Sequence, residues 1–478
     1  MRRFVRLAAA ALFTAPSPAS GQDGVVALTN AEVVDVVRGT IASRQTIIVR
    51  SGRIEEVGPS SVVRIPRAAT RVNVAGKFVI PGLWDMHVHL GGGASDVDAL
   101  KYYGSLFLAN GVTGVRDAGA GLARLRALDS LGVAEPGTMP RLVYAGEKIG
   151  PPPGGPWSIA DARAAIRGRL AAGARYAKLA PEYPAPLFRE TLGACAAMRT
   201  QCVSHVPAAD TAIWLSAPGR GSYEHLFNLA EHVSRVPAAD LFEVAREYAA
   251  PTLVERVLYK LRLRRRPPEP SAHRLAMRDT TKDEAFFRRV AESGTWITPT
   301  LVLHHFMQRA ADILPAAVDT SLSVQPLGPS TRSGTQKELS RGLWHMFTSL
   351  VRAMHGAGVQ MLSGTDFSPF HVPGAALHAE MLFLQQSGVP PAAVLRAATI
   401  NPARYLGAVD TLGSVASGRV ADLVVLRRNP LDDVRHVTEI EMMMTRGRLL
   451  RRGDLDRLTS SARAARGRMR AGDGQVRR

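Results

Sequence analysis

Residues 79–90 read VIPGLWDMHVHL, an apolar run that ends in the pair His87 and His89. Side chains at positions i and i+2 of a β-strand point to the same face, so a strand here would present both imidazoles together. Two imidazoles on one face at the end of a buried strand can begin a metal site. A lone His-x-His pair also fits two ordinary histidines near a strand end, so the rest of the chain has to decide.

Seven further apolar runs follow the first, and longer stretches of helical pattern separate them. Including the first, the runs cover residues 78–87, 112–117, 141–145, 175–180, 201–205, 223–227, 295–301 and 359–366. Strands that alternate with helices are typical of parallel α/β folds. The pattern predicts a TIM-like (β/α)8 barrel over residues 80–405, and in this fold the active site forms at the carboxyl ends of the strands.

The two ends of the chain have a different texture, with short β-rich runs divided by glycines. Residues 22–79 and 406–455 are therefore expected to build one small composite β-sandwich domain. A long segment at about 228–294, which contains PPEP at 267–270, is expected to be an arm inserted over the barrel mouth. The Arg/Gly/Ser-rich residues 456–478 are expected to form a disordered basic tail.

Residues 1–21 have the basic start, apolar centre and small-residue end of a secretory signal peptide. Export to a bacterial periplasm or beyond the cell is therefore expected, with a frayed cytosolic N-terminus as the alternative. No internal apolar run approaches the roughly 18 residues needed to span a bilayer. Cys195 and Cys202 are interpreted as buried small residues, although an exported chain could pair them.

The chain of 478 residues carries a formal net charge of +19, and the excess is mostly arginine. Basic runs can bind nucleic acid or anionic membranes. No interleaved aromatic residues and no nucleic-acid-binding motif accompany these runs, so a solvated basic surface is the simpler interpretation. No nucleic-acid partner is expected.

Five of the apolar runs contain or end in residues that can bind a metal ion, namely His87, His89, Lys178, His205, His225 and Asp366. In a barrel these side chains would converge on one mouth. Four imidazoles, an amine and a carboxylate could there hold two divalent ions such as Zn²⁺. Taken singly, His205 or His225 also fits a core histidine, and Lys178 fits a lysine whose stem is buried and whose amine reaches water.

Several segments resemble motifs of the metal-dependent amidohydrolase superfamily, in particular the branch of imidazolonepropionase-like enzymes and Xaa-Pro-type metallo-dipeptidases. The resemblance covers roughly residues 25–450 and rests on PGLWDMHVH at 81–89, GVTGVRD at 111–117, SGTD at 363–366, AATINPA at 397–403, GSV at 413–415 and GRVADLVV at 418–425. It implies that His87, His89 and Asp366 bind the more buried of two metal ions and that His205 and His225 bind the other. It also implies that Lys178 is N-carboxylated and that its carbamate bridges both ions.

The resemblance further implies hydrolysis of amide, peptide or cyclic amide bonds, in which metal-activated water attacks the carbonyl and Asp366 transfers the proton. Dipeptides or N-acyl amino acids are the expected substrates. A lactonase or ester hydrolase with the same metals, a mononuclear site, and an inactive barrel that acts as a binding protein are the alternatives. A further alternative is a protein that binds nucleic acid or membrane surfaces through its basic charge. A homo-oligomer stays open.

The chain departs from this branch after the third predicted strand, where relatives often carry Gly-Gly-His near the substrate. Here residues 146–157 read GEKIGPPPGGPW, so the histidine is replaced and a different substrate pocket is expected. The candidate substrate contacts are Tyr144, Lys148, Trp157, Tyr223 and His371.

Overall fold

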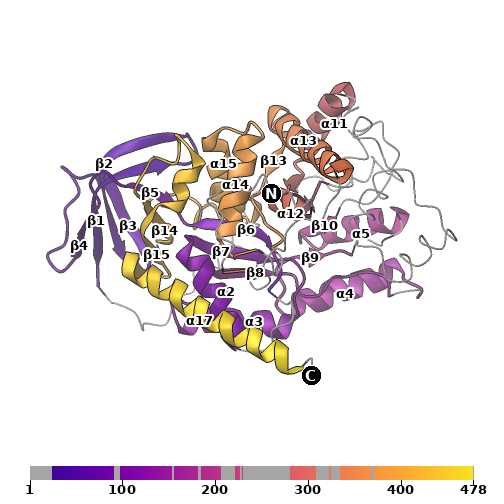
Figure 1. Cartoon of the computed structure of the whole chain (residues 1–478), viewed down its shortest axis with the longest axis horizontal. Helices are drawn as coiled ribbons and strands as arrows, with labels where there is room; N and C mark the ends of the chain where they lie inside the picture. The colour runs from indigo at the N-terminus through magenta and orange to yellow at the C-terminus, as the bar shows by residue number, and fades with distance from the viewer. Residues whose placement is uncertain are drawn as a thin grey trace.

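The computed structural model describes residues 24–90, 97–152, 155–180, 183, 185–205, 221–226, 229, 280–307, 322–323, 334–367 and 371–476. The expected signal peptide, residues 1–21, lies outside them. Within the described residues, no helix is long and apolar enough to cross a membrane. The chain forms a mixed sheet at one end of the molecule and an α/β region built on parallel strands beside it (Figure 1).

Strands from both ends of the chain build the mixed sheet. They are β1 (Val26–Asp35), β2 (Thr40–Arg50), β3 (Arg53–Pro59), β4 (Thr70–Asn73), β5 (Phe78–Pro81), β14 (Leu423–Leu426), β15 (Ile440–Thr445) and β16 (Arg448–Arg451). Their order is β16-β15-β14-β5-β1-β2-β3, with β4 paired to β1. The two ends of the chain meet where β5 pairs antiparallel with β14, with Ile80 opposite Val424. Apolar residues from both ends, such as Val79 and Val425, share one buried cluster there.

Each of the eight predicted runs overlaps a parallel strand, although the sixth of these strands begins two residues before its run. The strands are β6 (Leu83–Val88), β7 (Val112–Asp117), β8 (Arg141–Tyr144), β9 (Ala177–Lys178), β10 (Cys202–His205), β11 (Gly221–Glu224), β12 (Trp296–Thr298) and β13 (Gln360–Met361). All six residues of β6 and of β7 are buried, as expected for parallel strands covered on both faces.

The parallel strands form two sheets, β6-β7-β8 and β13-β12-β11-β10-β9. Backbone hydrogen bonds join their edges on both sides, from Met86 N to Ser363 O at 2.9 Å and from Arg175 N to Tyr144 O at 2.8 Å. The two sheets are therefore neighbours along both edges, and all eight strands point the same way. A Cβ at Gly82, where the first run divides into β5 and β6, would lie 2.1 Å from Thr113 Oγ1, so only glycine fits there.

Helices lie around the strands and on one another. They are α2 (Val97–Ala109), α3 (Leu122–Ala134), α4 (Ile159–Ala171), α5 (Ala185–Ala197), α11 (Thr280–Ser293), α12 (Leu301–Met307), α13 (Gly334–Gly356), α14 (Ala375–Gln386), α15 (Pro391–Ala398), α16 (Ile400–Tyr405) and α17 (Arg452–Val476), and a short 3₁₀ helix spans Val434–Thr438. A capping box between Ser158 and Asp161 starts α4. Of the arm expected at about 228–294, the structure describes only Leu229 and residues 280–294, which include α11.

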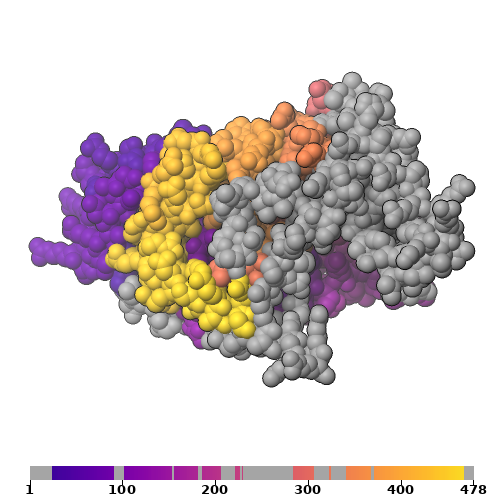
Figure 2. Space-filling model, viewed as in Figure 1, coloured from indigo at the N-terminus to yellow at the C-terminus, as the bar shows by residue number. Residues whose placement is uncertain are grey.

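The C-terminal segment corrects one expectation, because residues 456–476 belong to α17 and are not disordered. This helix packs along α2 (Figure 1) and forms part of the molecular surface in Figure 2. Leu455, Ala462 and Ala465 are buried, and Leu458 packs against the same core. These positions follow helical spacing, so they form one apolar stripe. The stripe consists of two leucines and two alanines and is inconspicuous among the arginines of the sequence.

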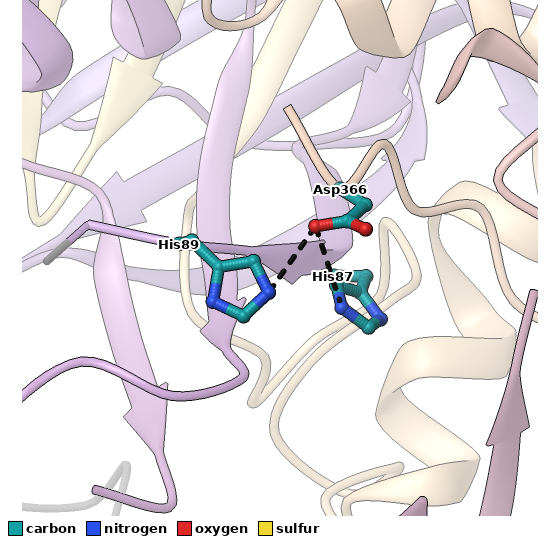
Figure 3. Close-up of side chains that lie close together, drawn as sticks. All are labelled: His87, His89 and Asp366. Carbon is teal, nitrogen blue, oxygen red and sulfur yellow. Dashed lines mark ion pairs between the residues drawn. The ribbon is translucent and has the colours of Figure 1, made fainter. Parts of the chain in front are cut away.

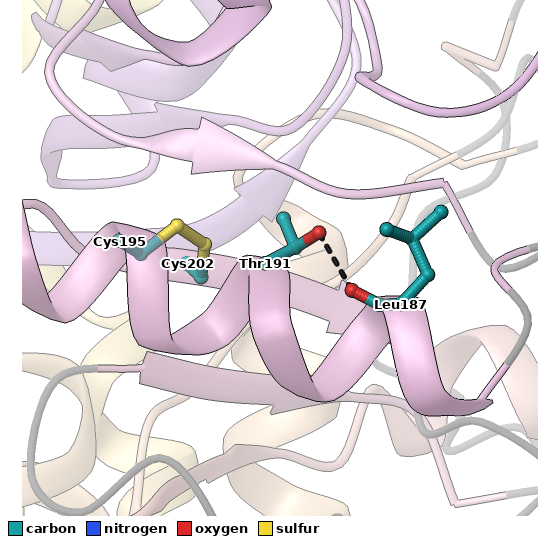
Figure 4. The surroundings of a disulfide bond; sticks show 4 residues. All are labelled: Leu187, Thr191, Cys195 and Cys202. Atoms are coloured by element: carbon teal, nitrogen blue, oxygen red, sulfur yellow. Dashed lines mark hydrogen bonds between the residues drawn. A yellow bond between two sulfur atoms is a disulfide. The ribbon is translucent and has the colours of Figure 1, made fainter. Parts of the chain in front are cut away.

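The two cysteines are buried, as expected, and they form a disulfide, the alternative that the sequence left open for an exported chain (Figure 4). Cys195 lies in the last turn of α5 and Cys202 begins β10, and their Cα atoms are 6.1 Å apart. That separation is within the usual range for a disulfide. The bond therefore fastens α5 to the strand that ends in His205.

Candidate functional site

The residues predicted to bind metal stand at the carboxyl ends of five parallel strands. His87 lies in β6 and His89 follows it, Lys178 ends β9, His205 ends β10, His225 follows β11, and Asp366 lies beyond β13. Because neighbouring strands are parallel, these ends meet on one edge of the α/β region. The predicted set therefore reaches one place through strand order, from segments far apart in the sequence.

His87, His89 and Asp366 form the tightest group of potential metal ligands (Figure 3). The Nε2 atoms of His89 and His87 lie 3.2 and 3.7 Å from Asp366 Oδ1. One ligand atom from each residue falls within 4.8 Å of the others. Asp366 has a φ of 46° and its N–H donates to His87 O at 2.7 Å, so backbone contact with β6 holds its carboxylate in place.

His225 and His205 extend this group. His225 Nε2 lies 3.5 Å from Asp366 Oδ2, and the ring centroids of His225 and His87 are 4.9 Å apart. The His205 ring packs edge-on against His225 at 4.7 Å. His225 Nδ1 is 2.8 Å from Thr300 Oγ1, which leaves Nε2 directed at Asp366. Three imidazoles therefore face the Asp366 carboxylate, and the fourth, His205, packs against one of them.

Lys178 is fully buried, and its Nζ has no hydrogen-bond partner among the described residues. Burial lowers the pKa of Lys178 to about 8, against the opposing attraction of the Glu224 carboxylate. A buried cationic donor without a partner is costly, so this position favours a neutral amine or a modified nitrogen. His87 Nε2 is likewise buried without a hydrogen-bond partner among these residues, and Asp366 Oδ1 is 3.7 Å away.

Burial disfavours the charged form of His87, His205 and His225, which favours a lone pair available to a metal ion. It lowers the pKa of His87, lowers that of His205 to about 3, and lowers that of His225 well below its usual value. Burial by itself would raise the pKa of Asp366, but the facing imidazoles of His87, His89 and His225 hold it well below the ordinary range. The site thus presents neutral nitrogen donors around an ionised carboxylate, a set suited to zinc or a similar divalent ion.

A second layer of polar groups beneath the imidazoles was not predicted. Glu224 Oε2 is 2.5 Å from His87 Nδ1, and Arg116 Nη2 donates to Glu224 Oε1 at 2.7 Å. Asp85 Oδ2 accepts a hydrogen bond from Thr365 Oγ1 at 2.8 Å, and Thr365 immediately precedes Asp366 in the chain. The sequence feature that could have indicated this second layer is a charged residue inside an otherwise apolar strand, such as Arg116 in GVTGVRD. A charged side chain in such a strand needs a buried partner.

Two candidate substrate contacts point away from the site. Arg116 reaches Ser222 and Glu224 inside the α/β region, so Tyr223 between them faces the other side of β11. Tyr144 pairs with Asp117, which immediately follows Arg116, and therefore also faces outward. Burial raises the pKa of Tyr144, and its electrostatic neighbours include Asp129 and Arg175. Neither phenol lines the group of imidazoles.

The other three candidates occupy different places. A Cβ on Gly119 would lie 3.3 Å from the His89 ring and 3.7 Å from Lys148 Cε, so His89 and Lys148 flank Gly119. Lys148 is exposed, and its charge lowers the pKa of both Lys178 and His205. His371 is buried, with Asp366 among its electrostatic neighbours. Trp157 Nε1 donates to Tyr183 Oη at 3.3 Å. Lys148 and His371 therefore border the site, whereas Trp157 is shown in contact with Tyr183.

Comparison with known proteins gives one family. The model of the amidohydrolase family matches residues 78–450. Imidazolonepropionase of Thermoplasma acidophilum is 35% identical over 108 residues, which are 22% of this chain and 26% of that enzyme. The match therefore spans about a quarter of that relative's length.

Solved structures resemble the chain over nearly its full length. A Xaa-Pro dipeptidase with bound methionine in the active site has a TM-score of 0.64 at 17% identity, over 90% of this chain and 100% of that one. Bottromycin amidohydrolase has a TM-score of 0.67 at 23% identity, over 98% of this chain and 95% of that one. A putative prolidase from Bifidobacterium longum has a TM-score of 0.61 at 24% identity, over 92% of this chain and 99% of that one. At these identities the likeness concerns the fold, an α/β architecture with a TIM-like barrel.

Proposed function

This chain belongs to the amidohydrolase family and is an enzyme that acts on carbon–nitrogen bonds, and we propose that it cleaves them with water activated by bound divalent metal ions. The observation that carries this proposal is the convergence of four imidazoles, one carboxylate and one buried amine at the strand ends. Consistent with a missing ligand, His87 Nε2 and Lys178 Nζ are buried without hydrogen-bond partners among the described residues.

The residues present fit a metal centre. His87, His89 and Asp366 would hold one ion, because their donor atoms already lie within 4.8 Å of one another. His205 and His225 would hold a second ion, and Lys178 would bridge the two after its amine has bound carbon dioxide and lost a proton. The carbamate so formed offers two oxygens, as a bridging carboxylate does. When bound, such ions lower the pKa of water and polarise the substrate carbonyl.

The chain's own residues complete the reaction. Asp366 would accept the proton of the attacking water and deliver it to the leaving nitrogen. Water oxygen then bonds to the carbonyl carbon, the carbon–nitrogen bond breaks, and an acid and an amine are released. Asp366 is suited to this transfer because its low pKa keeps it ionised, and because its two oxygens face His89 and His225.

We propose dipeptides or N-acyl amino acids as substrates. Both carry a free carboxylate next to the scissile amide, and the exposed ammonium of Lys148 lies beside His89, where it could pair with that carboxylate. Two structural neighbours bear the names Xaa-Pro dipeptidase and prolidase, which is consistent with substrates of this size. Lys148 is a departure from the Gly-Gly-His pattern, so the preferred residue next to the carboxylate should differ from that of those enzymes.

The finer architecture and the location of the protein are part of the same proposal. The eight parallel strands would close into one (β/α)8 barrel, supported by the hydrogen bonds that join both edges of the two sheets. The mixed sheet would be the small composite domain of sandwich type. We also propose export from the cytoplasm, supported by the Cys195–Cys202 disulfide, since disulfides persist mainly in oxidising compartments.

Metal content and hydrolysis test the proposal together. Protein purified without chelator is analysed for metal, for the wild type and for Lys178→Ala, and both are assayed on dipeptides, N-acyl amino acids and lactones. We expect about two ions per wild-type chain, fewer in the variant, and hydrolysis of the amides. Absence of metal from the wild type would contradict the mechanism, and hydrolysis of lactones alone would contradict the substrate class.

A further inference from the structure

Glu224 is a fully buried carboxylate directly beneath the predicted ligands, and the proposed mechanism does not use it. Its Oε2 lies 2.5 Å from His87 Nδ1. Its Oε1 accepts from Arg116 Nη2 at 2.7 Å and from Ser222 Oγ at 2.5 Å. Both carboxylate oxygens therefore have partners, one a predicted metal ligand and the other two groups outside the predicted ligand set.

The contact with Glu224 determines which nitrogen of His87 can bind a metal ion. A carboxylate only accepts hydrogen bonds, so Nδ1 facing Glu224 carries the ring proton. The lone pair of a neutral imidazole is then on Nε2. This Nε2 is the atom that lies 3.7 Å from Asp366 Oδ1 and has no hydrogen-bond partner among the described residues. The orientation and the tautomer of His87 thus both favour metal binding through Nε2.

Arg116 connects this carboxylate to the strand that carries His87. Besides Glu224, it donates from Nη1 to Ser222 Oγ at 2.8 Å and from Nε to Met86 O at 2.5 Å, and Met86 immediately precedes His87. Arg116 is fully buried and its guanidinium lies 5.1 Å from the Tyr405 ring centroid. One cation therefore balances the charge of Glu224 and also holds the backbone of β6 at the metal ligand.

We propose that Glu224 is a positioning residue that orients His87 for the metal ion, and that Arg116 is its structural counter-charge. This inference rests on the proposed function only in requiring that the site takes up a divalent ion. Second-layer carboxylates behind metal-binding histidines commonly affect metal affinity about 10- to 100-fold, because they hold the ring in position and make it a stronger ligand. We expect an effect of that size from loss of the Glu224 charge.

The test measures affinity for Zn²⁺ alone, by competition with a chromophoric chelator, in protein first stripped of metal. Glu224→Gln keeps the shape of the side chain and removes its charge, but it leaves Arg116 without a counter-charge. The double variant Glu224→Gln/Arg116→Met removes both charges at similar volume, which buried ion pairs often tolerate. The matched control is Asp422→Asn, which breaks another buried pair, Arg141 Nε with Asp422 Oδ2 at 2.6 Å, and leaves the metal ligands untouched.

We expect about 10- to 100-fold weaker Zn²⁺ binding in Glu224→Gln and in the double variant, and wild-type binding in Asp422→Asn. Thermal unfolding shows which variants are folded. If Glu224→Gln is not folded, the Zn²⁺ affinity of the double variant tests the role of Glu224. Wild-type affinity in the folded double variant would overturn the role of Glu224 even with the proposed function intact. Equally weakened Zn²⁺ binding in Asp422→Asn would overturn this role too, since the loss of any buried carboxylate would then weaken binding. Failure of the wild type to bind Zn²⁺ would overturn the proposed function itself.

Discussion

Replacing Lys178 by methionine should stabilise the metal-free protein while abolishing its activity. The lysine is fully buried, and burial lowers its pKa from 10.5 to about 8. Each pKa unit corresponds to about 1.4 kcal/mol, so a protonated Lys178 opposes folding by ~3 kcal/mol at neutral pH. Methionine has a similar length and no charge, so the variant loses this cost and keeps the packing.

The pH dependence follows from the direction of this shift. Below pH 8 the lysine is protonated in both the folded and the unfolded chain, and the full cost is present. As pH rises toward 10.5, the unfolded chain binds more protons at this group than the folded chain, so the stability of the wild type increases. The advantage of the variant should therefore shrink from ~3 kcal/mol at pH 7 to ~1 kcal/mol at pH 10.

Urea unfolding in the presence of a chelator measures this difference at both pH values. The control is Lys148→Met, which removes an exposed ammonium near the same site and should change stability little. The reasoning is refuted if Lys178→Met is no more stable than the wild type at pH 7, or if its advantage is the same at pH 10. Either result would mean that Lys178 is not held as a buried, metal-free amine.

Four further predictions concern the proton-transferring Asp366, the Lys148 ammonium proposed to bind the substrate carboxylate, the C-terminal helix α17 and the disulfide. Asp366→Asn should lower kcat by about 10²- to 10⁴-fold through loss of proton transfer, and near-normal turnover of a dipeptide would contradict this. Lys148→Met should raise KM for N-acyl amino acids by about fivefold without lowering kcat, and should not affect substrates whose carboxylate is amidated. Leu455→Ala should lower the free energy of unfolding by about 2 to 5 kcal/mol in a denaturant titration, whereas an unchanged midpoint would mean that α17 contributes little. Reduction of Cys195–Cys202 should cost about 2 kcal/mol of stability, visible as a lower Tm with dithiothreitol, because it releases a short closed loop.

The sequence predicted the parallel strands and their functional ends because both depend on local pattern. A strand buried on both faces reads as an apolar run, and all eight runs overlap a parallel strand. Ligands at strand ends appear as polar residues where such runs stop, as His205 and Asp366 do. The convergence of these residues then follows from parallel strand order alone.

The direction of a side chain was less predictable. Tyr144 and Tyr223 stand close to functional residues in the sequence, yet both face away from the site. A strand exposes alternate residues to opposite sides, so one position decides between the site and the outer face. Only the strand register and the contacts of Arg116 show that Tyr144 and Tyr223 lie on the outer face of their strands.

The sequence by itself determined the family, the eight parallel strands and a set of side chains able to bind metal ions. These features follow from short motifs and from hydrophobic period, which each segment carries without its neighbours. The tertiary structure alone decided that Glu224 and Arg116 are partners, that Cys195 meets Cys202, and that α17 packs on α2. Each of these depends on which segments lie side by side, because a buried charge, a thiol or an apolar stripe on a helix acquires its role only from the group it contacts.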